Sequence, residues 1–324
     1  MDKVTKVGQT VAGKNLRAPK GDRAGFRSEL SDMYNFRPLL KAIIVLPLML
    51  LALAACTALT VYNDMVPQDR AKEITVRDVA YGTAHRQKLD IYLPGKNMSN
   101  KDVVVFFYGG SWKLGRKEEL SFVASALAQR GYVVVVPDYR LVPEVVYPAF
   151  VEDTAKAIAW TYRNIGTYGG NPKRMFVSGH SAGAYNAMMV ALAPQFLAEE
   201  GLSPSIMQGV IGISGPYDFL PFEYKTLHRT FDSAAPDLAS TQPVNRAAEG
   251  RNTPPVLLLA GSAETLVPPK NPRNLAAALK KAHKPVDVKF YPGARHLDML
   301  FAFSKPGQKD SGVLDDMVAW MKSH

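Results

Sequence analysis

The sequence predicts an α/β fold, in which a mostly parallel, doubly wound sheet has helices on both faces. The main observation is an alternation of short apolar runs with helix-like segments over residues 103–322. Most of these runs are continuously apolar, as expected for strands that are buried on both faces of a sheet. The composition of the 324 residues, 47% hydrophobic and 21% charged, excludes a disordered chain, a collagen and a coiled coil.

The first two strands differ from the others because they alternate between apolar and polar residues. Residues 74–79 and 88–93 have this pattern, and residues 81–87 between them indicate an antiparallel hairpin. Buried strands are then expected at residues 103–108, 133–137, 174–178, 210–214, 256–260 and 286–291. Helices are expected at residues 117–129, 149–164, 182–192, 272–282 and 312–322.

One long stretch interrupts this alternation. Residues 215–253 separate two strands and are rich in Pro, Asp and aromatic residues. The stretch is too long for an ordinary loop, so we expect a small cap that packs over the carboxyl edge of the sheet. Nothing in the sequence marks a second domain boundary, and residues 74–324 are expected to form one domain.

The N-terminal region has the pattern of an export signal. Residues 42–63 form a 22-residue uncharged stretch, and Arg37 and Lys41 precede it. Its segment Leu53-Ala54-Ala55-Cys56 resembles a bacterial lipobox, and Cys56 is the only cysteine of the chain. We therefore expect residues 1–55 to be a leader and lipoprotein signal peptide, Cys56 to be lipidated, and residues 56–73 to be a linker.

Two alternatives remain open for this region. Translation that starts at Met33 would give a shorter basic segment before the apolar core. The uncharged stretch is also long enough for an uncleaved transmembrane anchor. As a lipoprotein or with an uncleaved anchor, the folded domain is expected outside the cytoplasm, tethered to a membrane of the bacterial cell envelope.

Charge and cysteine content limit the partners. The net charge is +10, but residues 1–55 contain nine Lys/Arg and four Asp/Glu, so half of it lies in the leader. The folded part has no basic run interleaved with aromatic residues, and nucleic acid is not an expected partner. One cysteine excludes an intrachain disulfide, and no Cys/His spacing suggests a metal site. Neither a metal nor a cofactor is expected.

The most specific motif is Gly179-His180-Ser181-Ala182-Gly183. It follows a predicted strand and begins a predicted helix, which is the context of a nucleophile elbow. Such a turn projects the serine hydroxyl above the edge of the sheet, at the positive end of a helix. The alternative is a tight turn with an unreactive serine.

A serine hydroxyl needs a neighbouring base, and in this arrangement the acid and then the base follow the nucleophile along the chain. His296 lies in the loop after the last strand and is the predicted base. Glu264 is the only carboxylate in the nine residues after the preceding strand and is the predicted acid, with Asp298 as the alternative. The side chain of His180, inside the elbow, is expected to point away from the serine.

The negative charge that develops during acyl transfer requires amide donors. One predicted donor is the backbone N–H of Ala182, directly after the nucleophile. The others are expected from Gly110 and Ser111 in the loop 108–112, because paired glycines let a backbone turn its amides inward. A plain Gly-Gly turn is the alternative.

With these residues together, the sequence resembles the α/β-hydrolase esterases and lipases. The most similar branches are the hormone-sensitive-lipase-like, feruloyl-esterase-like and kynurenine-formamidase-like groups. Further motifs that match are Leu89-Asp-Ile-Tyr-Leu-Pro94, Tyr108-Gly109-Gly110-Ser111-Trp112, Pro137-Asp-Tyr-Arg-Leu-Val-Pro-Glu144 and Gly261-Ser-Ala-Glu264. The resemblance covers roughly residues 81–324. It implies an α/β-hydrolase fold, a triad of Ser181, Glu264 and His296, and a structural ion pair between Asp138 and Arg140. Tyr108 and Glu264 depart from the family's usual His and Asp.

The function that follows is hydrolysis of a small-molecule carboxylic ester by a serine hydrolase. The same triad would also serve an amidase, a formamidase or a peptidase. A binding protein on a hydrolase scaffold is the non-enzymatic alternative, since a fold alone permits it.

Overall fold

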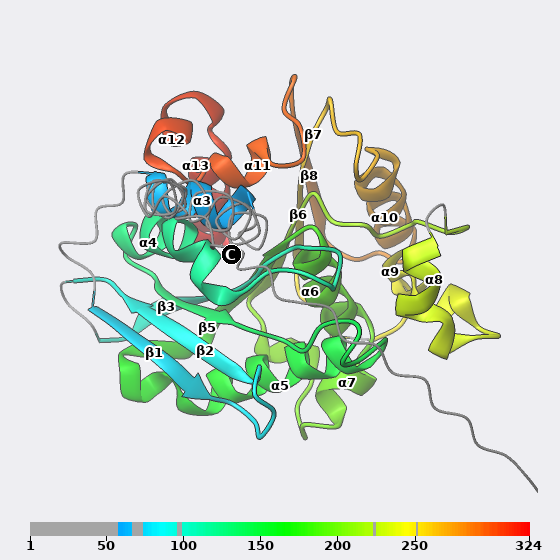
Figure 1. Cartoon of the computed structure of the whole chain (residues 1–324), viewed down its shortest axis with the longest axis horizontal. Helices are drawn as coiled ribbons and strands as arrows, with labels where there is room; N and C mark the ends of the chain where they lie inside the picture. Colours follow the sequence, from blue (N-terminus) through cyan, green and yellow to red (C-terminus); the bar gives the residue numbers. More distant parts are fainter. Residues whose placement is uncertain (1–57, 67–73, 96–98, 223–224, 251) are drawn as a thin grey trace, which may run out of the picture. The chain divides into compact units, whose positions relative to one another are not determined.

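Eight strands form one sheet in the order β1-β2-β4-β3-β5-β6-β7-β8 in the computed structural model, which describes residues 58–66, 74–95, 99–222, 225–250 and 252–324 (Figure 1). The strands are β1 (Ile74–Ala80), β2 (Lys88–Leu93), β3 (Lys101–Phe107), β4 (Val133–Pro137), β5 (Gly170–His180), β6 (Gly209–Ile213), β7 (Val256–Gly261) and β8 (Val286–Tyr291). β2 pairs antiparallel with β1 and with β4, and all the other pairs are parallel. The predicted fold class is confirmed.

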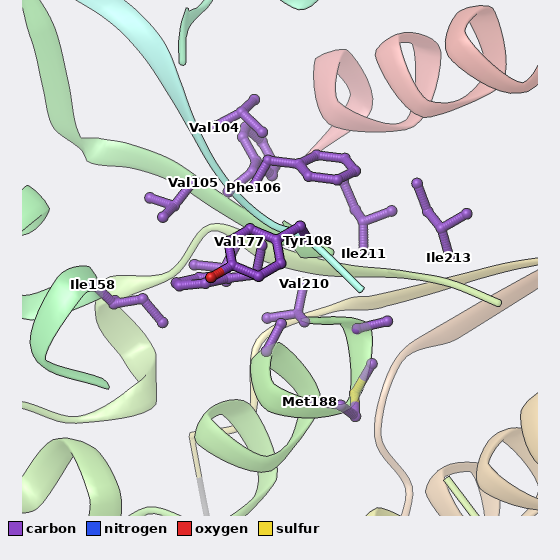
Figure 2. Close-up of a cluster of buried hydrophobic side chains, with 14 of the residues drawn as sticks. Val104, Val105, Phe106, Tyr108, Ile158, Val177, Met188, Val210, Ile211 and Ile213 are labelled. Carbon is purple, nitrogen blue, oxygen red and sulfur yellow. The ribbon is translucent and has the colours of Figure 1, made fainter. Parts of the chain in front are cut away.

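Burial along the strands explains their sequences. Every residue of β4, β6 and β7 is buried, as their unbroken apolar runs require. The expectation that β8 is buried on both faces is wrong, because β8 lies at the edge of the sheet. Its residues alternate between partly buried and exposed positions as far as Tyr291, which is buried. Figure 2 shows the centre of the core, where Val105, Val177 and Val210 of three neighbouring strands share the face of the sheet that is turned toward Ile158 and Met188 of two helices.

Helices lie on both faces of the sheet. α5 and α6 pack against β5, whereas α4 packs against β2 and β4. The α-helices are α3 (Ala58–Met65), α4 (Ser121–Gln129), α5 (Ala149–Asn164), α6 (Ala182–Leu192), α7 (Gln195–Ala198), α8 (Lys225–Phe231), α9 (Pro243–Arg246), α10 (Lys270–Lys281), α11 (Asp298–Phe301), α12 (Lys305–Ser311) and α13 (Val313–Ser323). The five helices that the sequence predicts are present, except that residues 117–129 divide into a 3₁₀ turn, η2 (Lys117–Leu120), and α4.

The segment predicted as a linker contains a helix that packs against the domain. In α3, the ring of Tyr62 stacks on Phe301 with centroids 3.9 Å apart, and its hydroxyl donates to Ser304 Oγ at 2.7 Å. Asn63 Oδ1 accepts a hydrogen bond from Ser121 Oγ at 2.7 Å, at the start of α4. Residues 58–66 therefore belong to the folded unit, contrary to the linker interpretation. Within the described residues, no helix is both long enough and apolar enough to cross a bilayer.

Residues 215–253, predicted as a cap, form α8, α9 and two 3₁₀ turns in their described part. Phe231 of α8 is fully buried and packs edge-on against Trp112, with ring centroids 5.0 Å apart. Phe222 is 9% exposed and also packs against Phe231. The aromatic residues of this segment thus form a packed cluster around the loop that follows β3.

Candidate active site

Ser181 occupies a strained turn between β5 and α6. β5 ends at His180, α6 begins at Ala182, and Ser181 has φ of 54° and ψ of −122°. Positive φ is unfavourable for a residue with a side chain and is found mainly where the surrounding structure imposes it. Here the amide of Ser181 donates to the carbonyl of Ile213 at 2.9 Å, which fixes the turn to the neighbouring strand β6. This is the geometry expected for a nucleophile elbow.

Close backbone approach explains the two outer glycines of the motif. A Cβ added to Gly179 would lie 2.4 Å from the carbonyl carbon of Gly183. A Cβ added to Gly183 would lie 2.2 Å from the carbonyl oxygen of Phe107 on β3. Contacts this short are not tolerated, so any larger residue would displace the start of α6 from the sheet and move the serine with it.

The predicted acid and base are hydrogen-bonded. Oε2 of Glu264 lies 2.9 Å from Nδ1 of His296, and Oε1 accepts the amides of Leu266 and Val267 at 3.1 and 3.2 Å. Burial alone would raise the pKa of Glu264, but these hydrogen bonds, above all the one to His296, outweigh it and hold the pKa below its usual value. The carboxylate is therefore charged at neutral pH and orients the imidazole with Nδ1 protonated.

His180 lies against the predicted base, a contact that the sequence did not suggest. Its ring centroid is 4.6 Å from that of His296, and its Nε2 is 3.0 Å from the carbonyl oxygen of His296. Because a carbonyl only accepts, Nε2 of His180 carries the proton and donates it to this bond. Burial, together with the His296 ring, lowers the pKa of His180 to about 3. Neutral His180, the residue next to Ser181, thus holds the His296 loop against the elbow.

The loop after β3 approaches the nucleophile directly. A Cβ added to Gly109 would lie 2.8 Å from Cβ of Ser181. Gly110 has φ of 119° and Ser111 has φ of 53°. Ala182 is the first residue of α6, where an amide has no partner within the helix. The structure thus brings the loop of Gly110 and Ser111 next to Ser181 and Ala182, and the three amides stay the predicted oxyanion donors.

Arg86 braces this loop and is a second residue that sequence reasoning missed. Its Nη2 donates to the hydroxyl of Tyr108, where the loop begins, and to the carbonyl of Gly115, just after it, both at 2.7 Å. Its Nε donates to the carbonyl of Tyr139 at 2.9 Å. The rings of Tyr108 and Tyr139 stack with centroids 4.6 Å apart. The hydroxyl of Tyr108, which stands where the family usually has histidine, therefore accepts a charged donor that holds the loop.

The ion pair expected between Asp138 and Arg140 is wrong. Asp138 pairs instead with Arg86, at 3.4 Å, and accepts the amide of Lys117 at 2.9 Å. Arg140 binds Asp153 through two side-chain hydrogen bonds of 2.8 and 2.7 Å. The β1–β2 hairpin places Arg86 beside Asp138, and α5 places Asp153 beside Arg140, so each residue has a different partner. Burial raises the pKa of Asp138 to about 6, although Arg86 opposes this shift.

Two other predicted residues have different outcomes. Asp298, the alternative acid, accepts the amide of Arg295 at 2.8 Å at the start of α11, whereas Glu264 binds the imidazole. Cys56, the predicted lipidation site, lies outside the described residues. Within those residues, no group of three or more His, Cys, Asp or Glu side chains is arranged to hold a metal ion.

Comparison with known families gives the site its context. The sequence profile of the BD-FAE family matches residues 89–279, which is more than half of the chain. The chain belongs to the BD-FAE family. The match extends from β2 through the elbow and the acid loop to α10, and so includes Ser181 and Glu264 but ends before His296.

Individual relatives are named as esterases or as a formamidase. The chain is 30% identical to isoprenylcysteine alpha-carbonyl methylesterase of Arabidopsis thaliana over 75% of its own length and 61% of the relative's. It is 32% identical to esterase LipC of Mycobacterium tuberculosis over 68% of its length and 59% of that protein. It is 34% identical to kynurenine formamidase of Danio rerio over 47% of its length and 50% of the relative's. The chain thus spans about three fifths of the length of the first two.

Solved structures share the fold. Esterase B of Lactobacillus rhamnosis, in complex with an inhibitor, matches with a TM-score of 0.72 at 17% identity, over 87% of this chain and 96% of that one. An esterase of Thermogutta terrifontis with bound butyrate matches with a TM-score of 0.63 at 21% identity, over 79% of this chain and 95% of that one. These likenesses establish the α/β-hydrolase fold of this chain.

Proposed function

We propose that this chain is a serine hydrolase that cleaves carboxylic esters through Ser181, His296 and Glu264. The observation on which the proposal depends most is the 2.9 Å hydrogen bond between Glu264 and His296, in a loop that also contacts the elbow through His180. The side chain of Glu264 is fully buried, and that of His296 is only 11% exposed and lies against His180, the residue before the strained Ser181. The esterase names of several relatives support the same chemistry.

The proposed reaction has two halves. Nε2 of His296 takes the hydroxyl proton of Ser181 as its oxygen attacks the ester carbonyl, and the charged Glu264 stabilises the resulting imidazolium. The amides of Gly110, Ser111 and Ala182 bind the oxyanion. His296 then protonates the leaving alcohol, which leaves an acyl group on Ser181. Water, deprotonated by His296, attacks the acyl-enzyme and releases the carboxylic acid.

A labelling experiment combined with turnover tests this proposal. A fluorophosphonate probe should label the protein at Ser181, and the protein should hydrolyse p-nitrophenyl acetate. The Ser181→Ala variant should lose labelling and at least about 10⁴-fold in kcat, while its circular dichroism spectrum stays that of the parent. A matched Ser178→Ala variant, which changes a buried serine on β5 three residues before Ser181, should still be labelled. Turnover by Ser181→Ala at the parent rate would refute the assignment.

Amide cleavage is the second candidate, because one relative is a kynurenine formamidase. The triad would act in the same way on an amide, with an amine as the leaving group. Parallel assays on short acyl esters and on N-formyl amides of aromatic amines separate the two activities. A higher kcat/KM for the N-formyl amides would favour a formamidase.

We also propose that the mature protein is an exported lipoprotein, attached to a membrane of the bacterial cell envelope through Cys56. The packing of α3 supports this over an uncleaved anchor. Tyr62 and Asn63, at the end of the uncharged stretch, pack within the folded domain, where Tyr62 stacks on Phe301 and Asn63 accepts a hydrogen bond from Ser121. This end of the stretch is therefore held by the domain, whereas a membrane-spanning helix needs roughly 17–25 residues within the bilayer. Mass spectrometry of the N-terminus should find a lipid on Cys56, and a retained leader would favour the anchor.

A further inference from the structure

Exposed large apolar side chains are few in the part of the chain that the structure describes, and they gather in two places. Leu114 is 61% exposed, Leu266 is 58% exposed and Leu297 is 41% exposed. These three leucines lie on the three loops of the candidate site. Val61 and Met65, both on α3, are 41% and 79% exposed. The remaining exposed side chain of this kind is Val146, at 36%.

Each of the three leucines is directly linked to a group of the site. The amide of Leu114 donates to the carbonyl of Gly110 at 3.0 Å, and that of Leu266 donates to Oε1 of Glu264 at 3.1 Å. Leu297 directly follows His296. A single exposed leucine is ordinary, but apolar side chains that gather around one feature mark an interaction surface. The loops of the predicted oxyanion donors, acid and base therefore present an apolar rim, defined here as Leu114, Leu266 and Leu297.

Helix α3 packs against α11, the helix that directly follows Leu297 of this rim. Tyr62 of α3 stacks on Phe301, and the amide of Phe301 donates to the carbonyl of Leu297 at 2.8 Å. Figure 1 shows α3 next to α4, α11 and α12, in agreement with these contacts. Ala58 is two residues after Cys56, so the two Cα atoms are at most about 7 Å apart. A lipid on Cys56 would hold α3, and with it the His296 loop, close to the bilayer surface.

We propose that the apolar rim and the exposed face of α3 dock on a lipid bilayer, so that Ser181 receives an ester from the lipid phase. This proposal rests on the proposed esterase function and names its substrate class, esters with a long hydrocarbon chain embedded in a membrane. The uncharged stretch of residues 42–63, whose last residues lie in α3, argues for a bilayer as the occupant. Lys113 and Arg116 near Leu114, and the exposed Arg295, add positive charge that suits anionic headgroups.

The test uses the full chain, reconstituted in vesicles of three parts phosphatidylcholine to one part phosphatidylglycerol. The N-terminal attachment then holds every variant at the bilayer, and only the contact between the rim and the bilayer differs from one variant to another. Hydrolysis of p-nitrophenyl palmitate in the vesicles is measured for the parent and for Leu114→Ser/Leu266→Ser/Leu297→Ser. Each rate is divided by the same protein's rate on water-soluble p-nitrophenyl acetate, which corrects for any change in the site itself.

The ratio should fall at least about tenfold in the triple serine variant, because three leucine side chains no longer enter the apolar phase. Val61→Ser/Met65→Ser should lower it as well, and the matched Met65→Leu should leave it unchanged. A ratio that stays within twofold in both serine variants overturns the docking proposal while the esterase function stands. Absence of acetate hydrolysis in the parent refutes the esterase function instead. If the parent forms dimers that dissociate in the triple variant while the ratio of palmitate to acetate hydrolysis stays constant, the rim is instead an interface with a second copy of the chain.

Discussion

The two halves of the candidate site are held together in different ways. Glu264 accepts hydrogen bonds from amides two and three residues further along its own loop, so its side chain is positioned locally. The oxyanion loop is instead braced by Arg86, which lies 22 residues before Tyr108 in sequence and reaches it from the hairpin of β1 and β2. The chemistry of the acid and base is thus encoded in short motifs, whereas the shape of the oxyanion loop depends on distant residues.

This difference predicts how each half fails. Removing a side chain of the acid–base half removes a proton acceptor or its counter-charge, which nothing nearby replaces. Removing a brace of the oxyanion half leaves the backbone amides present but less well positioned. The first kind of change should therefore cost far more activity than the second.

The largest effect is expected from His296. The His296→Ala variant loses the general base, so kcat on p-nitrophenyl acetate should fall by about 10⁴-fold or more. Glu264→Gln keeps the size of the side chain but removes the charge that stabilises the imidazolium, and its kcat should fall by about 10³-fold to 10⁴-fold. The alternative acid supplies a matched control, because Asp298→Asn should stay within about tenfold of the parent. A larger loss in Asp298→Asn than in Glu264→Gln would reverse the assignment of the acid.

A smaller effect is expected from the brace of the oxyanion loop. Arg86→Met removes the donors to Tyr108, Gly115 and Tyr139, and kcat should fall by about 10-fold to 100-fold, less than the loss of an oxyanion donor itself can cost. The effect should appear mainly in kcat, because a displaced oxyanion loop weakens transition-state stabilisation more than substrate binding.

The same hairpin offers a control for this prediction. Arg77 is 51% exposed and pairs with Asp90 at 3.4 Å, so Arg77→Met makes the same chemical change away from the loop. It should leave kcat within about twofold, since exposed ion pairs contribute little. If Arg86→Met folds and its kcat equals that of Arg77→Met, the brace has no role in turnover.

The contrast between the halves also explains what the sequence could predict. Gly179 and Gly183 indicate the elbow in the sequence, because close packing at these two positions admits no larger residue. The order of the strands then predicts Glu264 as the acid and His296 as the base. Strands β3 to β7 follow from apolar runs, whereas β1 and β2 follow from alternating patterns, and together they predict the fold class. These features are local in sequence, or follow from topology alone.

Features that depend on long-range side-chain contacts were not predictable in this way. Arg86 is one arginine in a hairpin turn, and nothing beside it in sequence indicates Tyr108 or Gly115 as partners. Helix α3 lies in a stretch whose apolar residues match an export signal, so its packing on Phe301 could not be separated from that pattern. The pairing of Asp138 with Arg86 depends on the same hairpin, which is why the expectation of Arg140 as its partner was wrong.

Acid sensitivity tests how the elbow and the base are joined. The folded state lowers the pKa of His180 to about 3 from its usual value near 6.5, so the unfolded chain binds more protons between these pH values. The contribution of neutral His180 is fully present above about pH 6.5. It falls by about 1.4 kcal/mol for each pH unit below that, or about 2 kcal/mol by pH 5.

The variant His180→Gln keeps a donor for the carbonyl of His296 and does not titrate. Urea unfolding at pH 7 and pH 5 should show a smaller loss of unfolding free energy for this variant than for the parent. Asp138, whose pKa of about 6 is raised, acts in the opposite direction, but it is present in both proteins and cancels in the difference. Parallel pH profiles for the two proteins would mean that His180 does not titrate as its burial requires.

The smallest effects are expected where α3 contacts both halves. Tyr62→Phe removes the hydrogen bond to Ser304, in the segment after His296, and keeps the stack on Phe301. Thr60→Val removes the 2.6 Å hydrogen bond to Glu119, in the turn after the oxyanion loop. Each should lower the free energy of unfolding by about 1 kcal/mol, the usual value of one hydrogen bond, as measured by urea titration. If α3 only rests on the surface, neither substitution should change the free energy of unfolding. If α3 joins the two halves, the double variant should lose about the sum of the two single losses of unfolding free energy.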